Sequence, residues 1–186
     1  MTIPHPNTSN SNSESNASYQ LRLATLKDAY EIHAVMDTCF QALEHQDYFI
    51  CDDLDYVKDI LSGHGFAVVA CLKNGKIVGN LLVKYPGITE ENLGYDVFRN
   101  EKDLNRVFHM DSASVLPLHR GHGLEGQMIG FAETMIDTSK YRYSFATVAP
   151  ENTASLKTLE KCGYRIIVTK EKYNNLMRHV MMKELI

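Results

Sequence analysis

Residues 115–128, which read VLPLHRGHGLEGQM, constrain the fold of this chain more than any other segment. An apolar, β-prone run passes here into a helical pattern through a turn that contains basic residues and glycines. The first backbone N–H groups of a helix have no intrahelical acceptor, and glycine lets an anion approach them closely. The sequence therefore predicts a strand, an anion-binding turn and a helix, in this order.

The composition is typical of a soluble globular protein, with 44% hydrophobic and 23% charged residues in a chain of 186. We expect a single domain over residues 19–186, preceded by a disordered segment at 1–18 that is rich in Ser, Asn, Thr and Pro. A net charge of −4 gives no general attraction to nucleic acid or to an acidic membrane. Because no secretory signal or bilayer-spanning run is found, the expected location is the cytoplasm.

Other uses of such residues receive no support from the sequence. The four cysteines are widely spaced, without a Cys-x-x-Cys pair, and are expected to be free thiols. His119 and His122 have no third donor at ligand spacing, so we expect no metal. No Gly-Lys-Ser or Gly-Lys-Thr follows the glycines, which excludes a P-loop nucleotide site.

Periodicity and turn residues predict the secondary structure. Strands are expected at 20–24, 66–72, 77–85, 106–116, 143–148, 164–169 and 178–185, and helices at 32–43, 56–61, 122–138 and 152–161. Residues 86–103 are expected to be a mobile connection with a short helix around 93–99, and 170–175 a polar connection. Strands and helices alternate only in the second half of the chain, which favours a mixed sheet over a uniformly parallel one.

The order of these elements and two segments resemble a GNAT-family N-acetyltransferase. The first segment, Arg120-Gly121-His122-Gly123-Leu124-Glu125, is similar to the family's signature of Arg or Gln, two residues, Gly, one residue, then Gly or Ala. The second runs from Asn152-Thr153-Ala154-Ser155 to Cys162-Gly163-Tyr164. The resemblance covers nearly all of the chain after residue 18. It implies an α/β (α+β) fold, with a mixed, mostly antiparallel sheet of six to seven strands flanked by about four helices.

The resemblance also implies a co-substrate, acetyl-coenzyme A (acetyl-CoA), whose pyrophosphate is wrapped by the glycine turn. The phosphates would be held by the positive charge of Arg120 and by the backbone amides of Gly121, His122, Gly123, Leu124, Glu125 and Gly126. Glu125 departs from the family pattern, because it places an anion at a small-residue position, and we expect its side chain to face solvent. Asn152 stands where the family's Asn meets the coenzyme arm, although a helix N-cap explains it equally well.

Two residues are candidates for the base that deprotonates the amine. His109 and Asp111 lie two residues apart on the predicted strand 106–116 and therefore face the same side of the sheet. Asp111 is favoured by its position in the resemblance, and His109 by an unperturbed pKa of about 6.5. The alternative is that both are only solvated or hydrogen-bonded strand residues. The family stabilises the oxyanion with a main-chain N–H at a distortion of this strand, which corresponds to about Val115.

The family's usual proton donor, a Tyr on the last helix, is replaced here by Leu159. A positioned general acid contributes about a hundredfold to ten-thousandfold, so its loss slows a reaction without abolishing it. Water or another phenol can then protonate the leaving thiolate. Tyr164 and Tyr173 are candidates for this role, although a role as aromatic side chains that pack in the core is the simpler interpretation of both.

The sequence thus predicts transfer of an acetyl group from acetyl-CoA to a primary amine of a small molecule or peptide. The alternatives are a non-catalytic acyl-CoA-binding sensor or partner module, which Leu159 and Glu125 would suit, and a different acyl donor. Asp47, Asp52, Asp53 and Asp55 would attract a polyamine or aminoglycoside, but a solvated helix start explains them better. A peptide acceptor leaves no readable signature, and the chain is expected to be a monomer or a homodimer.

Overall fold

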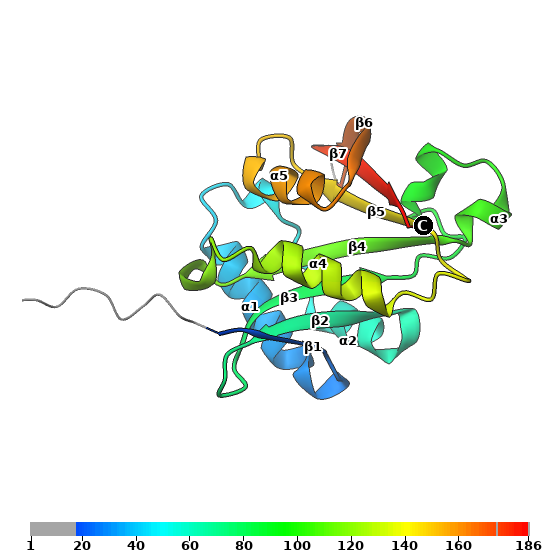
Figure 1. Cartoon of the computed structure of the whole chain (residues 1–186). Helices are drawn as coiled ribbons and strands as arrows, with labels where there is room; N and C mark the ends of the chain where they lie inside the picture. Colours follow the sequence, from blue (N-terminus) through cyan, green and yellow to red (C-terminus); the bar gives the residue numbers. More distant parts are fainter. Residues whose placement is uncertain (1–17, 174, 186) are drawn as a thin grey trace, which may run out of the picture.

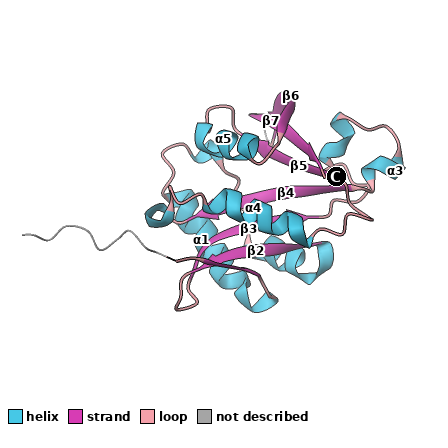
Figure 2. Ribbon diagram, viewed as in Figure 1, coloured by secondary structure: helices cyan, strands magenta, loops and turns pink. Residues whose placement is uncertain are grey.

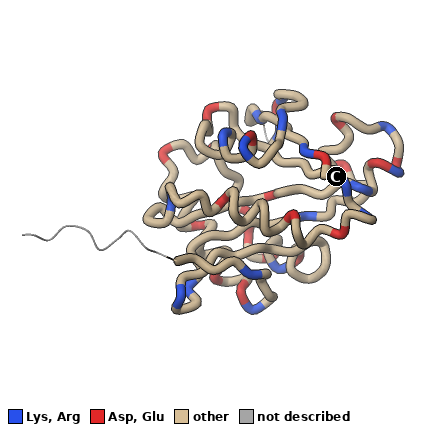
Figure 3. Tube along the Cα trace, in the orientation of Figure 1, with Lys and Arg blue, Asp and Glu red and all other residues tan. Residues whose placement is uncertain are grey.

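The computed structural model describes residues 18–173 and 175–185, so the predicted disordered segment lies outside the described residues apart from Ser18. Among these residues, no helix combines the length and apolar character needed to cross a membrane. Residues of both charges are spread along the chain and are not separated by sign (Figure 3).

The described residues form a seven-stranded sheet, which confirms the predicted mixed and mostly antiparallel architecture. The strands follow one another in space in the order β1-β2-β3-β4-β5-β7-β6, and only the β4–β5 pair is parallel. Their bounds are β1 Gln20–Leu23, β2 Gly65–Cys71, β3 Ile77–Lys84, β4 Val107–Val115, β5 Tyr143–Val148, β6 Arg165–Lys172 and β7 Leu176–Glu184.

Helices cover both faces of the sheet (Figures 1 and 2). The described chain contains α1 Ala29–Gln41, α2 Leu54–Asp59, α3 Glu101–Leu104, α4 Leu124–Met135 and α5 Thr153–Lys161. Buried side chains of α1 and α2 pack on β2 and β3 from one face. Those of α4 and α5 pack on β2 to β5 from the other face, in the larger hydrophobic core. The sheet is therefore the middle layer of three.

Local sequence explains the best-predicted elements. In α1, Ile32, Val35, Met36 and Cys39 recur at helical spacing and are all buried against the sheet. Between β2 and β3, Asn74-Gly75 makes the tight turn that its sequence predicts, with Gly75 at a φ of +87°. The hairpin is thus fixed by a backbone conformation that favours glycine.

The parallel pair β4–β5 is short and then opens. It pairs only Val107, Phe108 and His109 with Tyr143, Ser144 and Phe145. Beyond these pairs the remainder of β4, residues 110–115, has no partner on its β5 side. The two strands diverge toward the ends that lead into α4 and α5. This divergence exposes the backbone edges of both strands inside the sheet.

A β-bulge interrupts β4 where the strands diverge. Leu81 pairs with Ala113 and Val83 pairs with Met110, so that two residues of β4, Asp111 and Ser112, lie opposite Leu82. Consecutive strand residues normally point to opposite faces. Here both side chains reach the α2 side, because Asp111 contacts Tyr56 and Ser112 contacts Asp52. The bulge therefore places two polar side chains on one face.

Two connections differ from the prediction. The first half of the expected polar connection 170–175 belongs to β6, which extends to Lys172. As an edge strand, β6 pairs only with β7 and buries little of its surface, so its end carries no hydrophobic alternation. In place of one short helix around 93–99, a 3-10 turn covers Leu93–Asp96 and α3 follows at Glu101–Leu104.

Candidate active site

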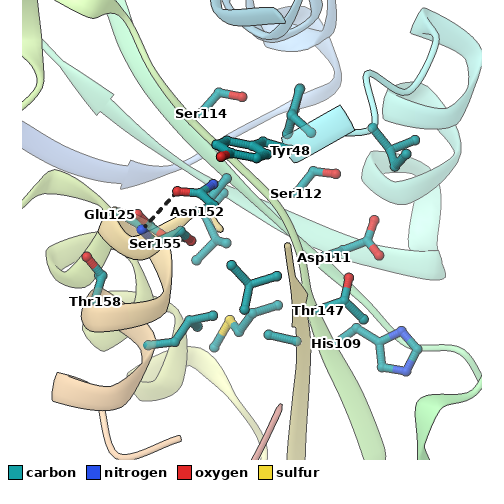
Figure 4. Close-up of a pocket in the computed structure, with 18 of the residues that line it drawn as sticks. Tyr48, His109, Asp111, Ser112, Ser114, Glu125, Thr147, Asn152, Ser155 and Thr158 are labelled. Atoms are coloured by element: carbon teal, nitrogen blue, oxygen red, sulfur yellow. Dashed lines mark hydrogen bonds between the residues drawn. The ribbon is translucent and has the colours of Figure 1, made fainter. Parts of the chain in front are cut away.

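A cleft of about 1000 Å³ occupies the gap between β4 and β5. Its walls come from the connection between α1 and α2, the starts of α4 and α5, the end of β6 and the start of β7. Figure 4 shows Asp111 and His109 toward one side of this cleft and Glu125, Asn152 and Ser155 toward the other. The cleft therefore joins the predicted catalytic strand to the predicted phosphate-binding turn.

The turn before α4 presents a row of free backbone donors. Within the described residues, the amide N–H groups of residues 121–126 donate to no acceptor. The first amide of this helix with an acceptor is that of Gln127, which donates to the Gly123 carbonyl oxygen at 3.0 Å. Gly121 and Gly123 have φ angles of +82° and +69°, which favour glycine at both positions. This arrangement can bind an anion through several N–H groups at once.

Other predicted members of the phosphate site occupy its edges. Arg120 is exposed and turns back toward β4, where its Nε donates to the Val115 carbonyl oxygen at 3.1 Å. The exposed His122 ring packs against Tyr19, with ring centroids 5.6 Å apart. Val115 itself pairs with Gly79 of β3. The distortion of β4 lies at Asp111–Ser112, about three residues before Val115, and the position of the oxyanion donor stays a prediction.

Glu125 does not face solvent as expected. Its carboxylate points toward α5, where Oε1 accepts a hydrogen bond from the Ser155 hydroxyl at 2.7 Å, and the residue lines the cleft. Burial raises the pKa of Glu125 to about 7, although the Ser155 hydroxyl acts in the opposite direction. The small Gly126 beside it allows close packing on α5, since a Cβ there would lie 3.6 Å from Thr158. Close approach of the two helices thus turns the carboxylate inward.

Asn152 lies at the start of α5 on the opposite side of the cleft (Figure 4). Its Oδ1 accepts the Ser155 N–H at 3.3 Å, so the residue is the N-cap of α5. Since it also lines the cleft, both interpretations of Asn152 remain compatible with its position.

His109 and Asp111 share a face of β4 but differ in their surroundings. The His109 ring is buried, and its Nε2 accepts the Leu93 N–H at 3.1 Å. Burial lowers the pKa of His109 to about 3, with a further contribution from the positive charge of Lys84. The imidazole is therefore neutral, and its acceptor nitrogen is occupied by the backbone.

Asp111 has the properties of a base that works near neutral pH. Burial raises its pKa to about 6, while a hydrogen bond from the Tyr56 hydroxyl, 2.6 Å from Oδ2, lowers it. A carboxylate with such a pKa is ionised at pH 7 yet retains affinity for a proton. Its position in the cleft lets it face a reacting group.

Asp52 is a second carboxylate of the cleft, which no sequence pattern distinguishes from its acidic neighbours. Its Oδ2 accepts a hydrogen bond from the Ser112 hydroxyl at 2.8 Å, and burial raises its pKa. Asp53 is instead the N-cap of α2, and Asp55 pairs with Lys58 on the surface. The expectation of a solvated helix start therefore holds for the last two but not for Asp52. The position of Asp52 depends on the bulge of β4, which brings Ser112 to this face and has no signal in the sequence.

The phenols suggested as proton donors lie on different sides of the sheet. Tyr164 is buried in the core under α4 and α5, where its hydroxyl lies 2.5 Å from Ser144 Oγ, so it does not line the cleft. Tyr173 lines the cleft, with its hydroxyl 3.4 Å from Thr147 Oγ1. Leu159 packs in the same core as Tyr164 and forms part of the cleft floor.

Neither a metal site nor a disulfide is found in the described part of the chain. No group of three His, Cys, Asp or Glu side chains is arranged to hold a metal ion there. All four cysteines are free thiols, as their spacing predicts.

Comparisons with known proteins agree with this geometry. Three solved structures share the fold, and each is aligned over at least 90% of either chain. The first is an acetyltransferase of the GNAT family from Streptococcus pneumoniae, with a TM-score of 0.68, 18% identity, and coverage of 90% of this chain and 100% of that one. The second is yncA, a putative acetyltransferase from Salmonella typhimurium with its cofactor acetyl-CoA, with a TM-score of 0.65, 15% identity, and coverage of 91% of this chain and 95% of that one. The third is NAA60 from Arabidopsis thaliana in complex with acetyl-CoA, with a TM-score of 0.72, 11% identity, and coverage of 90% of this chain and 99% of that one.

No curated protein matches the chain significantly in sequence. The model of the acetyltransferase (GNAT) family, in contrast, matches residues 28–164, which include the bulged strand β4, the glycine turn and all of α5. The chain belongs to the GNAT family of acetyltransferases.

Proposed function

We propose that this protein transfers an acetyl group from acetyl-CoA to a primary amine. The observation that carries the proposal is the continuity of one cleft. It extends from the turn with free backbone amides, where it is lined by Gly121, Gly123, Leu124 and Glu125, to the buried carboxylate of Asp111. The amides suit a pyrophosphate, and the diverging strands leave an open backbone edge on β4 for an extended arm. Two of the similar structures, from Salmonella typhimurium and Arabidopsis thaliana, contain acetyl-CoA and support this assignment.

Asp111 is the proposed base, because His109 has no free acceptor nitrogen. The carboxylate takes a proton from the ammonium group of the acceptor, and the freed amine lone pair attacks the thioester carbonyl carbon. A backbone N–H at the bulge stabilises the oxyanion. The carbon–sulfur bond then breaks, the nitrogen gives up its second proton to water, and the departing thiolate takes a proton. A thiol with a pKa of about 8.5 is an undemanding leaving group, so water can supply this proton despite Leu159.

The test is release of free thiol from acetyl-CoA in the presence of a panel of primary amines. We expect release that depends on the acceptor, and a loss of kcat/KM of about a hundredfold to ten-thousandfold in Asp111→Asn. Asp137→Asn, which changes an exposed aspartate after α4, is the matched control and is expected to retain activity. Saturable binding of acetyl-CoA without turnover, together with no effect of Asp111→Asn, would favour the sensor.

The pH dependence tests the role of Asp111 separately. The ionised carboxylate is the active form, so kcat/KM is expected to rise with pH and to level off above about 6. The Tyr56 hydrogen bond lowers the pKa of Asp111, so Tyr56→Phe should move the rise to higher pH. Tyr30→Phe, which alters an exposed tyrosine of α1, should leave the profile in place. A profile that does not move in Tyr56→Phe would contradict Asp111 as the base.

A further inference from the structure

Arg178, near the start of β7, is a buried charge to which the proposed transfer chemistry gives no role. It lines the cleft and is only 3% exposed. Its Nη2 donates to the Asp47 carbonyl oxygen at 2.5 Å and its Nη1 to the Met177 carbonyl oxygen at 3.0 Å. No carboxylate of the described residues forms an ion pair with the guanidinium.

Burying a charge is costly unless an opposite charge compensates it. A guanidinium has five N–H donors, and the two recorded hydrogen bonds leave three of them without an acceptor. The two carbonyl oxygens orient the group, yet they do not neutralise it. Burial lowers the pKa of Arg178, and the nearby negative charges of Asp47 and Glu151 oppose this effect. Neither carboxylate pairs with the guanidinium, so its free N–H groups can receive a further anion.

The wall around Arg178 keeps a positive balance, because Arg178 and Lys172 outnumber the single carboxylate of Glu171, which lines the same wall. Lys172, at the end of β6, also lines the cleft and forms no ion pair with a described residue. By contrast, Lys84 pairs with Glu91 and Lys170 pairs with Asp96. The opposite wall carries the carboxylates of Asp52 and Asp111. The two walls therefore differ in sign.

Tyr173 lines the cleft beside Arg178 and is also affected by the charge of Asp111 on the opposite wall. The Arg178 guanidinium lies 6.0 Å from the centroid of its ring, and its hydroxyl lies 3.4 Å from Thr147 Oγ1 on β5. Burial raises the pKa of Tyr173, the negative charge of Asp111 adds to this effect, and Arg178 opposes it. Both charges therefore act on the same phenol, with Arg178 and Asp111 on the same side of the sheet.

We propose that the acceptor is a primary amine that also carries a carboxylate, and that Arg178 binds this carboxylate while the amine faces Asp111. This inference rests on the acetyl transfer proposed above. β5 lies between β4 and β7, and paired strands are about 4.8 Å apart, so two strand spacings give about 10 Å. Because β4 and β5 diverge beyond His109, Asp111 and Arg178 start farther apart than this. An ω-amino acid or a short peptide spans this distance better than an α-amino acid.

Matched pairs of acceptors test the proposal in the wild-type protein. Each pair consists of an amine with a free carboxylate and its neutral amide, in a series from α-amino acids through ω-amino acids to tripeptides. We expect the acid of the longer pairs to have a KM lower by roughly tenfold to a hundredfold, because a charged hydrogen-bonded pair is lost in the amide. Equal KM values for acid and amide throughout the series would overturn the proposal.

Arg178→Met should raise the KM of the preferred acid to that of its amide, with little change for the amide and for binding of acetyl-CoA. Arg178→Lys keeps the charge and should retain part of the preference, and it also decides the matter if Arg178→Met fails to fold. Arg165→Met, an exposed arginine of β6, is the matched control. An equal loss of activity with acid and amide would mean that Arg178 only holds the α1–α2 connection in place through the Asp47 carbonyl oxygen. Weaker acetyl-CoA binding in Arg178→Met would place Arg178 in the coenzyme site.

Both of those results would overturn the carboxylate proposal and leave acetyl transfer intact. Absence of thiol release with every amine, from a folded protein, would instead contradict the transfer reaction and the carboxylate proposal with it. The two failures are therefore distinguishable.

Discussion

At the scale of single residues, Glu125 is the side chain whose charge most directly affects the proposed phosphate site. It belongs to the row of free amides, yet its carboxylate turns toward Ser155 inside the cleft. With a pKa raised by burial to about 7, it is protonated in mild acid and ionised in mild base. The protonated form removes a negative charge from the neighbourhood of the bound phosphates.

We therefore expect the affinity for acetyl-CoA to fall as the pH rises through about 7, because ionised Glu125 repels the pyrophosphate. Bound phosphates should raise the pKa of Glu125 further. For each unit of this increase, acetyl-CoA should bind about tenfold more weakly to the protein with ionised Glu125 than to the protein with protonated Glu125. Calorimetric titrations between pH 6 and 8 measure this change. In Glu125→Gln the change should be smaller, whereas Glu101→Gln on the exposed start of α3 should behave as the wild type. Identical pH dependence in wild type and Glu125→Gln would contradict the assignment.

Only the part of this site that is built from backbone groups could be predicted from the sequence. The amides of residues 121–126 were predicted because glycines and a helix start are visible in a sequence. The inward turn of Glu125 depends on how closely α4 approaches α5, and Gly126 alone does not determine this. Arg178 was not identified, because an arginine on a predicted strand gives no sign that the α1–α2 connection will cover it.

At the scale of elements, the left-handed conformation of Gly123 before α4 makes the free amides possible. Gly123→Val forces a β-branched residue to a φ of +69°, which costs about 1–2 kcal/mol of folding stability. We expect it also to weaken acetyl-CoA binding at least tenfold, because the amides can no longer converge.

Gly75→Val is the matched control for this change. Gly75 has a φ of +87° in the β2–β3 turn, with open space around the added Cβ, so its strain should be similar. Thermal melting should show comparable losses of stability in the two variants, and titration with acetyl-CoA should show a loss only in Gly123→Val. If Gly123→Val and Gly75→Val bind acetyl-CoA with equal affinity, the turn before α4 is not the pyrophosphate site.

The strands themselves were predictable, but the bulge of β4 was not. Residues 106–116 alternate well enough to predict one strand, and a single extra residue at Asp111–Ser112 leaves no compositional mark. The bulge depends on the pairing with Leu82 of β3, which is a contact distant in sequence. It nevertheless decides which side chains face the cleft, since it brings Ser112 to the same side as Asp111.

At the scale of the whole molecule, the three-layer arrangement and the sheet follow from patterns that a sequence carries. The Asn74-Gly75 hairpin and the helical spacing in α1 predict antiparallel and covered parts of the sheet. The cleft has no such local origin, because it arises where β4 and β5 stop pairing after His109 and Phe145. Its two ends, the amides before α4 and Arg178 on β7, lie more than fifty residues apart in the chain.

We propose that acetyl-CoA occupies this divergence between β4 and β5. A crystal structure of the protein with acetyl-CoA bound tests it most directly. We expect pyrophosphate oxygens within about 3.2 Å of amide nitrogens in residues 121–126, with the acetyl carbon beside the Asp111–Ser112 bulge. A coenzyme bound on another surface, or one whose phosphates make no contact with these amides, would contradict the account.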